Sequence, residues 1–440
     1  MTPAARTSDR PLACIVMAGG KGTRMRSSLT KVLHPIWGRP LLGWVLAAVA
    51  EAGAERVVVV VPPDAAEAVA AVATGAETVV QHDQLGTGDA VRCAMPALDG
   101  FDGDVLVVSG DTPLLTGDLL AGLVADHAGA DATVATFRTA DPGAYGRVLR
   151  DGGTVRIVEA KDATPDELAV DEVNAGLYVF AAAALRPALD GLTSDNAQGE
   201  YYLPDVLPAM GTVAASLVED ASLLLGVNTR VELAEAAAII RDRLLEQHLL
   251  AGAGIVDPAT TYVDADVVLE PDCVVHPYTI LRGATRLASG AVAGPHSVLT
   301  DSVLEAGAQA GPFAHLRPGT HLHAGARVGA FAETKNAEVG ARSKIPHLSY
   351  VGDAEIGEDT NIGAGNITAN YDGTAKHRTV IGDRVHTGSD CVFVAPVTIG
   401  DDATTGAGSI ITDDVPAEAL AIARARQVVK EHYAKRKRDA

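Results

Sequence analysis

The sequence predicts a chain of two parts, an α/β unit around a parallel sheet and then a parallel β-helix. In residues 12–230, short runs of Val, Ile and Leu alternate with Ala- and Leu-rich stretches of helical character. This alternation is typical of parallel strands covered by helices on both faces. In residues 253–425, apolar residues recur every six positions among many glycines, which indicates the stacked coils of a β-helix. A helical stretch at residues 231–252 joins the two parts.

The elements of the first part follow in order. The strand candidates are residues 12–17, 56–61, 104–109, 131–137 and 174–180, and the helix candidates are residues 41–53, 65–73, 88–98 and 119–129. Parallel sheets bind ligands at the carboxyl ends of their strands. We therefore expect binding sites in the loops that follow the strands.

The second part contains a ladder of apolar residues six positions apart, which we expect to point into the solenoid. The ladder slips by one residue twice and is interrupted at residues 369–380, where we expect a functional loop outside the coils. Its positions are Val256, Tyr262, Val268, Val274, Ile280, Arg286, Val292, Val298, Leu304, Ala310, Leu316, Leu322, Val328 and Thr334, then Val339, Ile345 and Val351, then Ile356, Ile362 and Thr368, and finally Ile381, Thr387, Phe393, Ile399, Thr405 and Ile411.

The composition excludes several classes of partner. The chain has 440 residues, a net charge of −21 and 48% hydrophobic residues, so it offers no extended basic surface to a nucleic acid. No apolar run near the N-terminus approaches the ~18 residues of a membrane span. The four cysteines form no C-x-x-C pair, so we expect a reduced, cytoplasmic protein without a membrane partner. Residues 1–11 are expected to be a flexible N-terminus, and residues 426–440 a solvated basic tail.

A Gly-rich loop, "AGGKGTRMRSSLTK", follows the first predicted strand. Its glycine N–H groups, together with Arg24 and Lys31, have the chemistry to hold a triphosphate. The spacing is neither that of a P-loop nor that of a dinucleotide fingerprint. The alternative is a Gly-rich turn with solvated basic residues.

Asp111 lies two residues beyond another predicted strand, in "VLVVSGDTPLL". A carboxylate there can hold Mg²⁺ against phosphate oxygens. The alternative is a helix N-cap, a position that Asp also favours. The glycines and amides of "QHDQLGTGDAV", at another strand end, suit the recognition of a base edge.

Taken together, these motifs resemble a known family. "MAGGKGTRM", "LTKVLH", "QLGTGDA", "SGDTPLL", "VNAGLYVF" and "GVNTR" resemble the sugar-phosphate nucleotidyltransferases. With "FAHLRPGT", "AFAETKNAEVG", "KIPHLSYVGDAEIG", "NIGAGNITANYDG" and "TGSDCVFVAPVTIG", the chain closely resembles the bacterial bifunctional enzymes that make UDP-N-acetylglucosamine. The resemblance covers residues 12–428. It implies a Rossmann-like α/β nucleotidyltransferase domain followed by a left-handed parallel β-helix of hexapeptide repeats.

For the first domain, the resemblance implies Mg²⁺-dependent uridylyl transfer from UTP to N-acetylglucosamine-1-phosphate. The implied nucleotide contacts are Met17, Ala18, Gly19, Gly20, Arg24, Lys31, Gln81, Gly86, Thr87, Ser109, Gly110 and Asp111. Asp111 and Asn228 are the implied metal ligands, and the implied sugar contacts are Gly146, Glu159 and Asn174. Asp89 is a departure, since a His is common at this position, and it changes the charge near the base.

For the β-helix, the resemblance implies acetyl transfer from acetyl-CoA to glucosamine-1-phosphate in a homotrimer, with sites between subunits. His347 is the implied general base, an assignment that fits imidazole chemistry, and Glu333 is expected to orient it. The implied contacts to glucosamine-1-phosphate are Arg317, Lys335, Tyr350 and Asn361, and those to acetyl-CoA are Ala364, Asn370, Tyr371, Lys376, Ser389, Ala407 and Arg424.

The same residues leave three other interpretations open. His321 and His323 could suggest a metal pair, but we expect exposed turn residues, because no carboxylate or cysteine lies at a suitable spacing in the sequence. A single-function nucleotidyltransferase could carry the β-helix only for oligomerisation, although such a solenoid has no need of Arg317, Lys335 and His347 together. A non-enzymatic scaffold or sugar-nucleotide sensor would not need both Asp111 and Asn228.

Overall fold

The computed structural model describes residues 10–20, 22–151 and 154–440. Residues 1–9 of the predicted flexible N-terminus therefore lie outside the described residues. The chain divides into two compact units, the first ending at Ile240 and the second beginning at Arg241.

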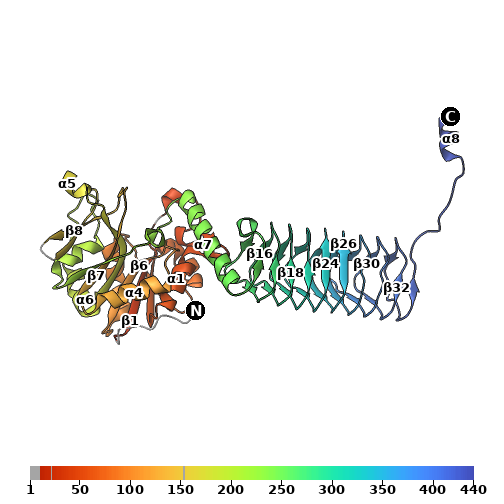
Figure 1. The fold of residues 1–440 in the computed structure, drawn as a ribbon, viewed down its shortest axis with the longest axis horizontal. Coiled ribbons are helices and arrows are strands. Elements are labelled where there is room, and N and C mark those ends of the chain that lie inside the picture. The colour runs from red at the N-terminus through yellow and green to blue at the C-terminus, as the bar shows by residue number, and fades with distance from the viewer. Residues whose placement is uncertain (1–9, 21, 152–153) are drawn as a thin grey trace. The chain divides into compact units, whose positions relative to one another are not determined.

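A nine-stranded sheet forms the centre of the first unit (Figure 1). Its main path runs β11-β7-β10-β6-β1-β4-β5, and the hairpin β8–β9 pairs with β10. The bounds are β1 Leu12–Met17, β4 Arg56–Val61, β5 Glu77–Val80, β6 Asp104–Ser109, β7 Ala132–Arg138, β8 Arg147–Asp151, β9 Thr154–Val158, β10 Glu172–Ala181 and β11 Val213–Leu217; β2 Pro35–Ile36 and β3 Arg39–Pro40 form a separate small hairpin.

All five predicted strands are present, but the sheet is mixed rather than parallel. β1 is parallel to β4 and β6, whereas β10 is antiparallel to both β6 and β7. A parallel return needs a long crossover, usually a helix. The chain between β7 and β10 instead forms the β8–β9 hairpin and the short helix α5 (Pro165–Leu168). A strand buried on both faces reads the same in either direction, so the apolar run alone does not reveal the reversal.

Helices cover both faces of this sheet, as predicted. Alternate residues of β1 enter opposite cores: Cys14 packs with α1, α2 and α4, whereas Ile15 packs with α3 and α6. The bounds are α1 Leu41–Glu51, α2 Ala66–Val72, α3 Thr87–Ala94, α4 Gly117–His127 and α6 Ala182–Asp190, with short 3₁₀ turns at residues 23–25, 31–33, 63–65, 95–98, 203–209 and 221–224. The connecting helix α7 spans Arg230–Leu250.

Short parallel strands build the second unit as a solenoid (Figure 1). One face is the sheet β12-β15-β18-β21-β24-β26, and a larger sheet forms the others. The bounds are β12 254–255, β13 262–263, β14 268–269, β15 274–275, β16 280–282, β17 286–287, β18 292–293, β19 298–300, β20 302–304, β21 309–310, β22 315–316, β23 320–322, β24 327–330, β25 333–339, β26 344–347, β27 350–356, β28 367–369, β29 379–381, β30 392–394, β31 397–399, β32 404–405, β33 410–411 and β34 420–421.

The period of six is confirmed, but the register of the first ladder positions is wrong by one residue. Val268 is 37% exposed whereas Leu269 is 6% exposed, and the same offset places Val275 inward rather than Val274. The buried column is Val263, Leu269, Val275, Leu281, Leu287, Ala293 and Leu299, and from Leu304 onward the predicted positions are themselves buried. At most of these positions the predicted residue and the residue after it are both apolar. The sequence pattern therefore predicts the period but not which of the two residues points inward.

The interruption at residues 369–380 is a loop, as predicted. β28 ends at Ala369, β29 begins at Thr379, and most residues between them are exposed. The coils continue in register on both sides, since Tyr350 pairs with Ile367 and Ala354 pairs with Thr379. The last helix, α8, spans Tyr433–Arg438 and is exposed throughout. Within the described residues, every helix is too short or too polar to cross a membrane.

Candidate functional sites

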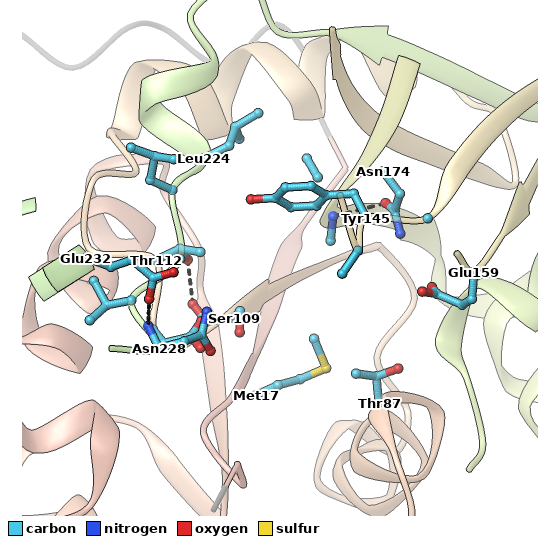
Figure 2. A pocket seen from close by; sticks show the side chains of 18 of the residues that line it. Met17, Thr87, Ser109, Thr112, Tyr145, Glu159, Asn174, Leu224, Asn228 and Glu232 are labelled. Carbon is cyan, nitrogen blue, oxygen red and sulfur yellow. Dashed lines mark hydrogen bonds between the residues drawn. The ribbon is translucent and has the colours of Figure 1, made fainter. Parts of the chain in front are cut away.

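Two adjoining cavities open at the carboxyl ends of β1 and β6. One measures about 400 Å³ and is lined by the Gly-rich loop, and the other measures about 360 Å³. Met17, Thr87, Ser109 and Asp111 line both cavities. Figure 2 shows the second cavity, with Met17 and Thr87 on one side and Tyr145 opposite. Two ligands, one in each cavity, would meet at Ser109 and Asp111.

The ammonium of Lys31 links the two predicted metal ligands. Its Nζ donates hydrogen bonds to Asp111 Oδ2 and to Asn228 Oδ1, the latter over 3.0 Å. Both Lys31 and Asp111 have largely buried side chains. Gly22 permits this arrangement, because it has a φ of +58° and a Cβ there would lie 2.7 Å from Lys31 Cβ. Two oxygens from distant parts of the chain thus converge on a single positive charge.

Glu232, which the sequence analysis missed, holds the Asn228 loop. Its Oε2 accepts a hydrogen bond from the backbone N–H group of Asn228 over 2.7 Å (Figure 2). It also accepts from the Thr229 N–H over 2.7 Å and from Thr229 Oγ1 over 3.0 Å. Thr229 Oγ1 also accepts the Glu232 N–H. This is a capping box at the start of α7, and the Thr-x-x-Glu spacing could have revealed it.

Asp89 fixes the amide of Gln81 in the nucleotide-side cavity. Gln81 Nε2 donates to Asp89 Oδ2 over 2.8 Å and to the Gly86 carbonyl over 3.0 Å, so Oε1 faces Gly19. Arg92 donates to the other Asp89 oxygen. Burial raises the pKa of Asp89, but the hydrogen bonds from Gln81 and Arg92 outweigh it and leave the pKa lowered. The departure at position 89 is therefore an ionised carboxylate that orients a predicted base contact.

The second cavity contains the predicted sugar contacts. Gly146, Glu159 and Asn174 line it, together with Tyr145, which the sequence analysis did not identify. Asn174 donates to Tyr178 Oη over 2.6 Å. Burial, and then repulsion from Asp205 and Asp162, raises the pKa of Glu159.

Two of the predicted residues of the first unit lie outside both cavity linings. Arg24 is exposed in the 3₁₀ turn at residues 23–25. Gly110 packs behind the loop, where a Cβ would lie 3.3 Å from Ala18 Cβ. The remaining predicted contacts line one or both cavities: Met17, Ala18, Gly19, Gly20, Lys31, Gln81, Gly86, Thr87, Ser109, Asp111, Gly146, Glu159, Asn174 and Asn228.

On the β-helix, the predicted phosphate ligands form a cationic cluster. The neighbouring Lys376 side chain, and then the charge of Arg317, disfavour the protonated form of Lys335 and lower its pKa. Asp353 lies beside the cluster and accepts hydrogen bonds from Asn370 and Asn336. Adjacent cations of this kind have the chemistry of an anion site.

Glu333 does not orient His347 in this structure. Its Oε1 accepts a hydrogen bond from Arg317 over 2.9 Å. Glu333 pairs with Tyr350 on one face of the solenoid, whereas His347 pairs with Ala330 on the neighbouring face. The coil turns a corner between the two residues, which neither residue's identity could indicate.

His347 begins a corner of small, accessible residues that runs along successive coils. The backbone links are Gly365 N–H to the His347 carbonyl, Asp390 N–H to that of Ala364, and Gly408 N–H to that of Ser389. His347, Ser389 and Ala407 are exposed. Gly408 lies near the Arg424 side chain, so the predicted CoA contacts Ala364, Ser389, Ala407 and Arg424 follow one corner.

Three further predicted residues, Asn361, Tyr350 and Tyr371, have other neighbours. Asn361 lies beside Lys344 and His386 on the face of β26, and Tyr350 packs over Gly352. Tyr371, on the extruded loop, is 60% exposed and donates to the Gly373 carbonyl. The described contacts therefore divide the predicted acetyl site between the His347 corner and the cationic cluster.

The prediction that His321 and His323 are exposed turn residues without a carboxylate nearby is wrong, because His321 lies in β23 and both side chains are half-buried. Glu305 Oε1 lies 2.9 Å from His321 Nε2 and 3.1 Å from His323 Nδ1. Glu338 Oε2 lies near the other nitrogen of each ring. The sequence spacing misled because residues one coil apart become neighbours in a solenoid.

Known proteins match both units. Residues 14–206 match the model of the MobA-like NTP transferase domain, and residues 378–413 match the bacterial transferase hexapeptide model of six repeats. The chain is 51% identical to the bifunctional protein GlmU of Kineococcus radiotolerans, over 94% of this chain and 89% of that protein. For the bifunctional protein GlmU of Streptomyces coelicolor the identity is 48%, over 98% and 95%, and for that of Mycobacterium tuberculosis it is 47%, over 97% and 92%.

Proposed function

The chain belongs to the family of the bifunctional protein GlmU, and from that premise we propose how its two sites divide two reactions. It is a bifunctional transferase of UDP-N-acetylglucosamine synthesis. It acetylates glucosamine-1-phosphate, and it transfers uridylyl from UTP to N-acetylglucosamine-1-phosphate with release of pyrophosphate. We assign uridylyl transfer to residues 12–230 and acetyl transfer, with acetyl-CoA as donor, to the left-handed β-helix of residues 253–425.

The observation that carries the uridylyl assignment is the pair of cavities that meet at Asp111. UTP occupies the cavity of the Gly-rich loop, and Gln81 receives its base. The sugar phosphate occupies the second cavity, where Glu159 and Asn174 contact the sugar. Its phosphate oxygen then attacks the α-phosphorus of UTP in line, and pyrophosphate leaves toward the loop. In this reaction the chain positions the two substrates and supplies positive charge, and it forms no covalent intermediate.

We propose Asp111 and Asn228 as ligands of Mg²⁺. The convergence of their oxygens on the Lys31 ammonium supports a cation site, and carboxylate and amide oxygens suit this ion. When bound, Mg²⁺ supplies positive charge that neutralises the phosphate oxygens. With Mg²⁺ on the two oxygens, the Lys31 ammonium would be available to pair with a phosphate.

For acetyl transfer, His347 accepts the proton of the glucosamine amine as the nitrogen attacks the thioester carbonyl. The acetyl group moves to nitrogen, and the CoA thiolate leaves and is protonated. Arg317 and Lys335 hold the sugar phosphate, whose negative charge offsets the repulsion within the cationic cluster. Tyr350 and Asn361 contact the sugar, and CoA follows the corner from Ala364 to Arg424, beside Asn370, Tyr371 and Lys376.

We propose a homotrimer in which neighbouring chains complete this site. An exposed ladder of rings supports the assembly: Tyr278, His296, Phe313 and Phe331 stack with centroids 4.7, 4.9 and 5.1 Å apart. Phe331 is 60% exposed, and the ladder continues to Leu348, beside His347. Contiguous exposed apolar surface of this kind is normally covered by a partner. The four free cysteines support the cytoplasm as the compartment.

Two variants, one in each domain, test the assignment of the two reactions. Lys31→Ala is expected to lower uridylyl transfer by about 10²–10³-fold and leave acetyl transfer unchanged. His347→Ala is expected to lower acetyl transfer by about 10²–10⁴-fold and leave uridylyl transfer unchanged. Pyrophosphate release from UTP and thiol release from acetyl-CoA, each measured without the other donor, read the two activities. Equal loss of both activities in either variant would contradict the assignment.

A further inference from the structure

The cluster around His321 and His323 lies outside both transferase sites. Glu305, His321 and His323 each place one donor atom within 4.8 Å of the others. Glu338 adds a second carboxylate on the opposite side of the rings. All four side chains are partly exposed, so a small ion can reach them.

The coils hold these side chains rigidly. His321 and His323 flank the buried Leu322 and therefore point outward together. Glu305 N–H donates to the Leu322 carbonyl, and His323 N–H donates to that of Val339, so three successive coils are in register. Ala324 N–H donates to Glu305 Oε2 over 3.0 Å, which directs Oε1 at the imidazoles.

The ring protons are the decisive point. A neutral imidazole carries one N–H and one lone pair. If Glu338 accepts the N–H from His321 Nδ1 and His323 Nε2, the lone pairs of His321 Nε2 and His323 Nδ1 both face Glu305 Oε1. In this tautomer three possible ligand atoms converge, and the two adjacent carboxylates favour a divalent cation between them.

We propose that Glu305, His321 and His323 bind a divalent transition-metal cation of the zinc class, with Glu338 orienting both imidazoles. The donor separations of 2.9 and 3.1 Å need to open by only a few tenths of an ångström for ligand bonds of about 2.0–2.2 Å in a tetrahedral site. A carboxylate on the second N–H of each ligating His is the usual outer partner of such sites. The fourth position remains open to solvent, and the ion ties successive coils together.

The binding test uses the untagged full chain after chelation and dialysis. Mg²⁺ is kept in millimolar excess, because it saturates oxygen sites and competes poorly for imidazole. Calorimetric titration with Zn²⁺ is expected to give about one ion per chain, and Co²⁺ is expected to give the intense visible absorption of a tetrahedral site. Zn²⁺ is also expected to raise the melting temperature, because it binds the folded chain.

Variants assign the ion to these residues. The double variant His321→Gln and His323→Gln is expected to weaken Zn²⁺ binding at least about 100-fold and to lose the Co²⁺ absorption. Glu338→Gln is expected to weaken binding about 10-fold. His276→Gln, a partly exposed histidine elsewhere on the solenoid, is the matched control and is expected to bind as the wild type does. Equal Zn²⁺ uptake by the double variant, or no uptake by the wild type, would overturn the proposal; retained acetyl transfer reports that the β-helix of the variant is folded.

Discussion

The two units build their candidate sites in opposite ways. In the first unit the functional residues line two cavities at the carboxyl ends of buried strands, and one chain brings Lys31, Asp111 and Asn228 together. On the β-helix they lie on the outer surface of the coils, and no described contact within one chain joins His347 to the cationic cluster around Lys335. An α/β sheet therefore assembles a site within one fold, whereas a solenoid presents parts of a site that a second chain can complete.

The largest expected effect comes from breaking the proposed trimer, on which only the proposed acetyl site depends. Phe331→Arg places a charge in the exposed ring ladder and is expected to disperse that assembly. Acetyl transfer should fall by about 100-fold, as for other central interface residues, while uridylyl transfer stays within about twofold. Sedimentation with both assays measures this. Val256→Arg, also exposed but off the ladder, is the control; a fully active, monomeric Phe331→Arg protein would refute the comparison.

A smaller effect is expected from loosening one strand-end loop of the first unit. Glu232→Ala removes the acceptor of three hydrogen bonds and leaves Asn228 poorly placed. We expect a loss of about 1–2 kcal/mol in the free energy of unfolding and about tenfold less uridylyl transfer, with acetyl transfer unchanged. Thermal unfolding and the Mg²⁺ dependence of uridylyl transfer measure these effects. Glu246→Ala on the same helix provides the charge-matched control.

The Gln81–Asp89 contact offers a test of base recognition. Asp89→Asn lets the Gln81 amide rotate, so the KM for UTP is expected to rise about tenfold with little change in kcat. Because the folded pKa of Asp89 is lowered, its stabilising contribution is present above the unfolded pKa and is lost as pH falls through the folded one. Steady-state kinetics with UTP and CTP measure the change. Asp83→Asn, exposed in the same loop, should behave as wild type. If the Asp89→Asn variant keeps the wild-type preference for UTP over CTP, Asp89 does not orient Gln81.

The smallest effect concerns Glu159, whose pKa is raised by burial and then by Asp205 and Asp162. A raised carboxyl pKa makes the folded state bind its proton more tightly than the unfolded state does. The stabilising contribution is therefore complete below the unfolded pKa and is lost as pH rises through the folded pKa. Glu159→Gln is expected to raise the melting temperature at pH 7 by about 1–2 °C, with the difference from wild type vanishing in acid. A difference that persists in acid would exclude this cause.

The sequence predicts features that depend on neighbours along the chain. The five long strands, the six-residue period and the loop after Ala369 follow from apolar runs and their interruption. Strand direction does not, because β10, which is antiparallel to its neighbours, is buried along most of its length like the parallel strands β1 and β6. The ladder register is also hidden wherever two apolar residues are adjacent, as at Val268 and Leu269.

Contacts across coils are the second limit of sequence analysis. His321 contacts Glu305 and Glu338, which lie 16 and 17 positions away, because one coil brings them alongside. No local sequence motif indicates that these residues are neighbours. Conversely, Glu333 and His347 are similarly separated but lie on different faces. The six-residue period therefore predicts which residues are one coil apart. The positions of the corners determine which of those residues come into contact.

The loop between Ala369 and Thr379 bears on how such a protein can change over evolution. It leaves the stack at one corner and returns to the next strand in register, so the core below it is undisturbed. Each coil touches only its neighbours, and a longer corner can therefore add ligand contacts without repacking. Cavity residues of the α/β unit have no such freedom, since they end the strands that build its core. New specificity can thus be acquired by insertion on the solenoid, but requires substitution in the sheet.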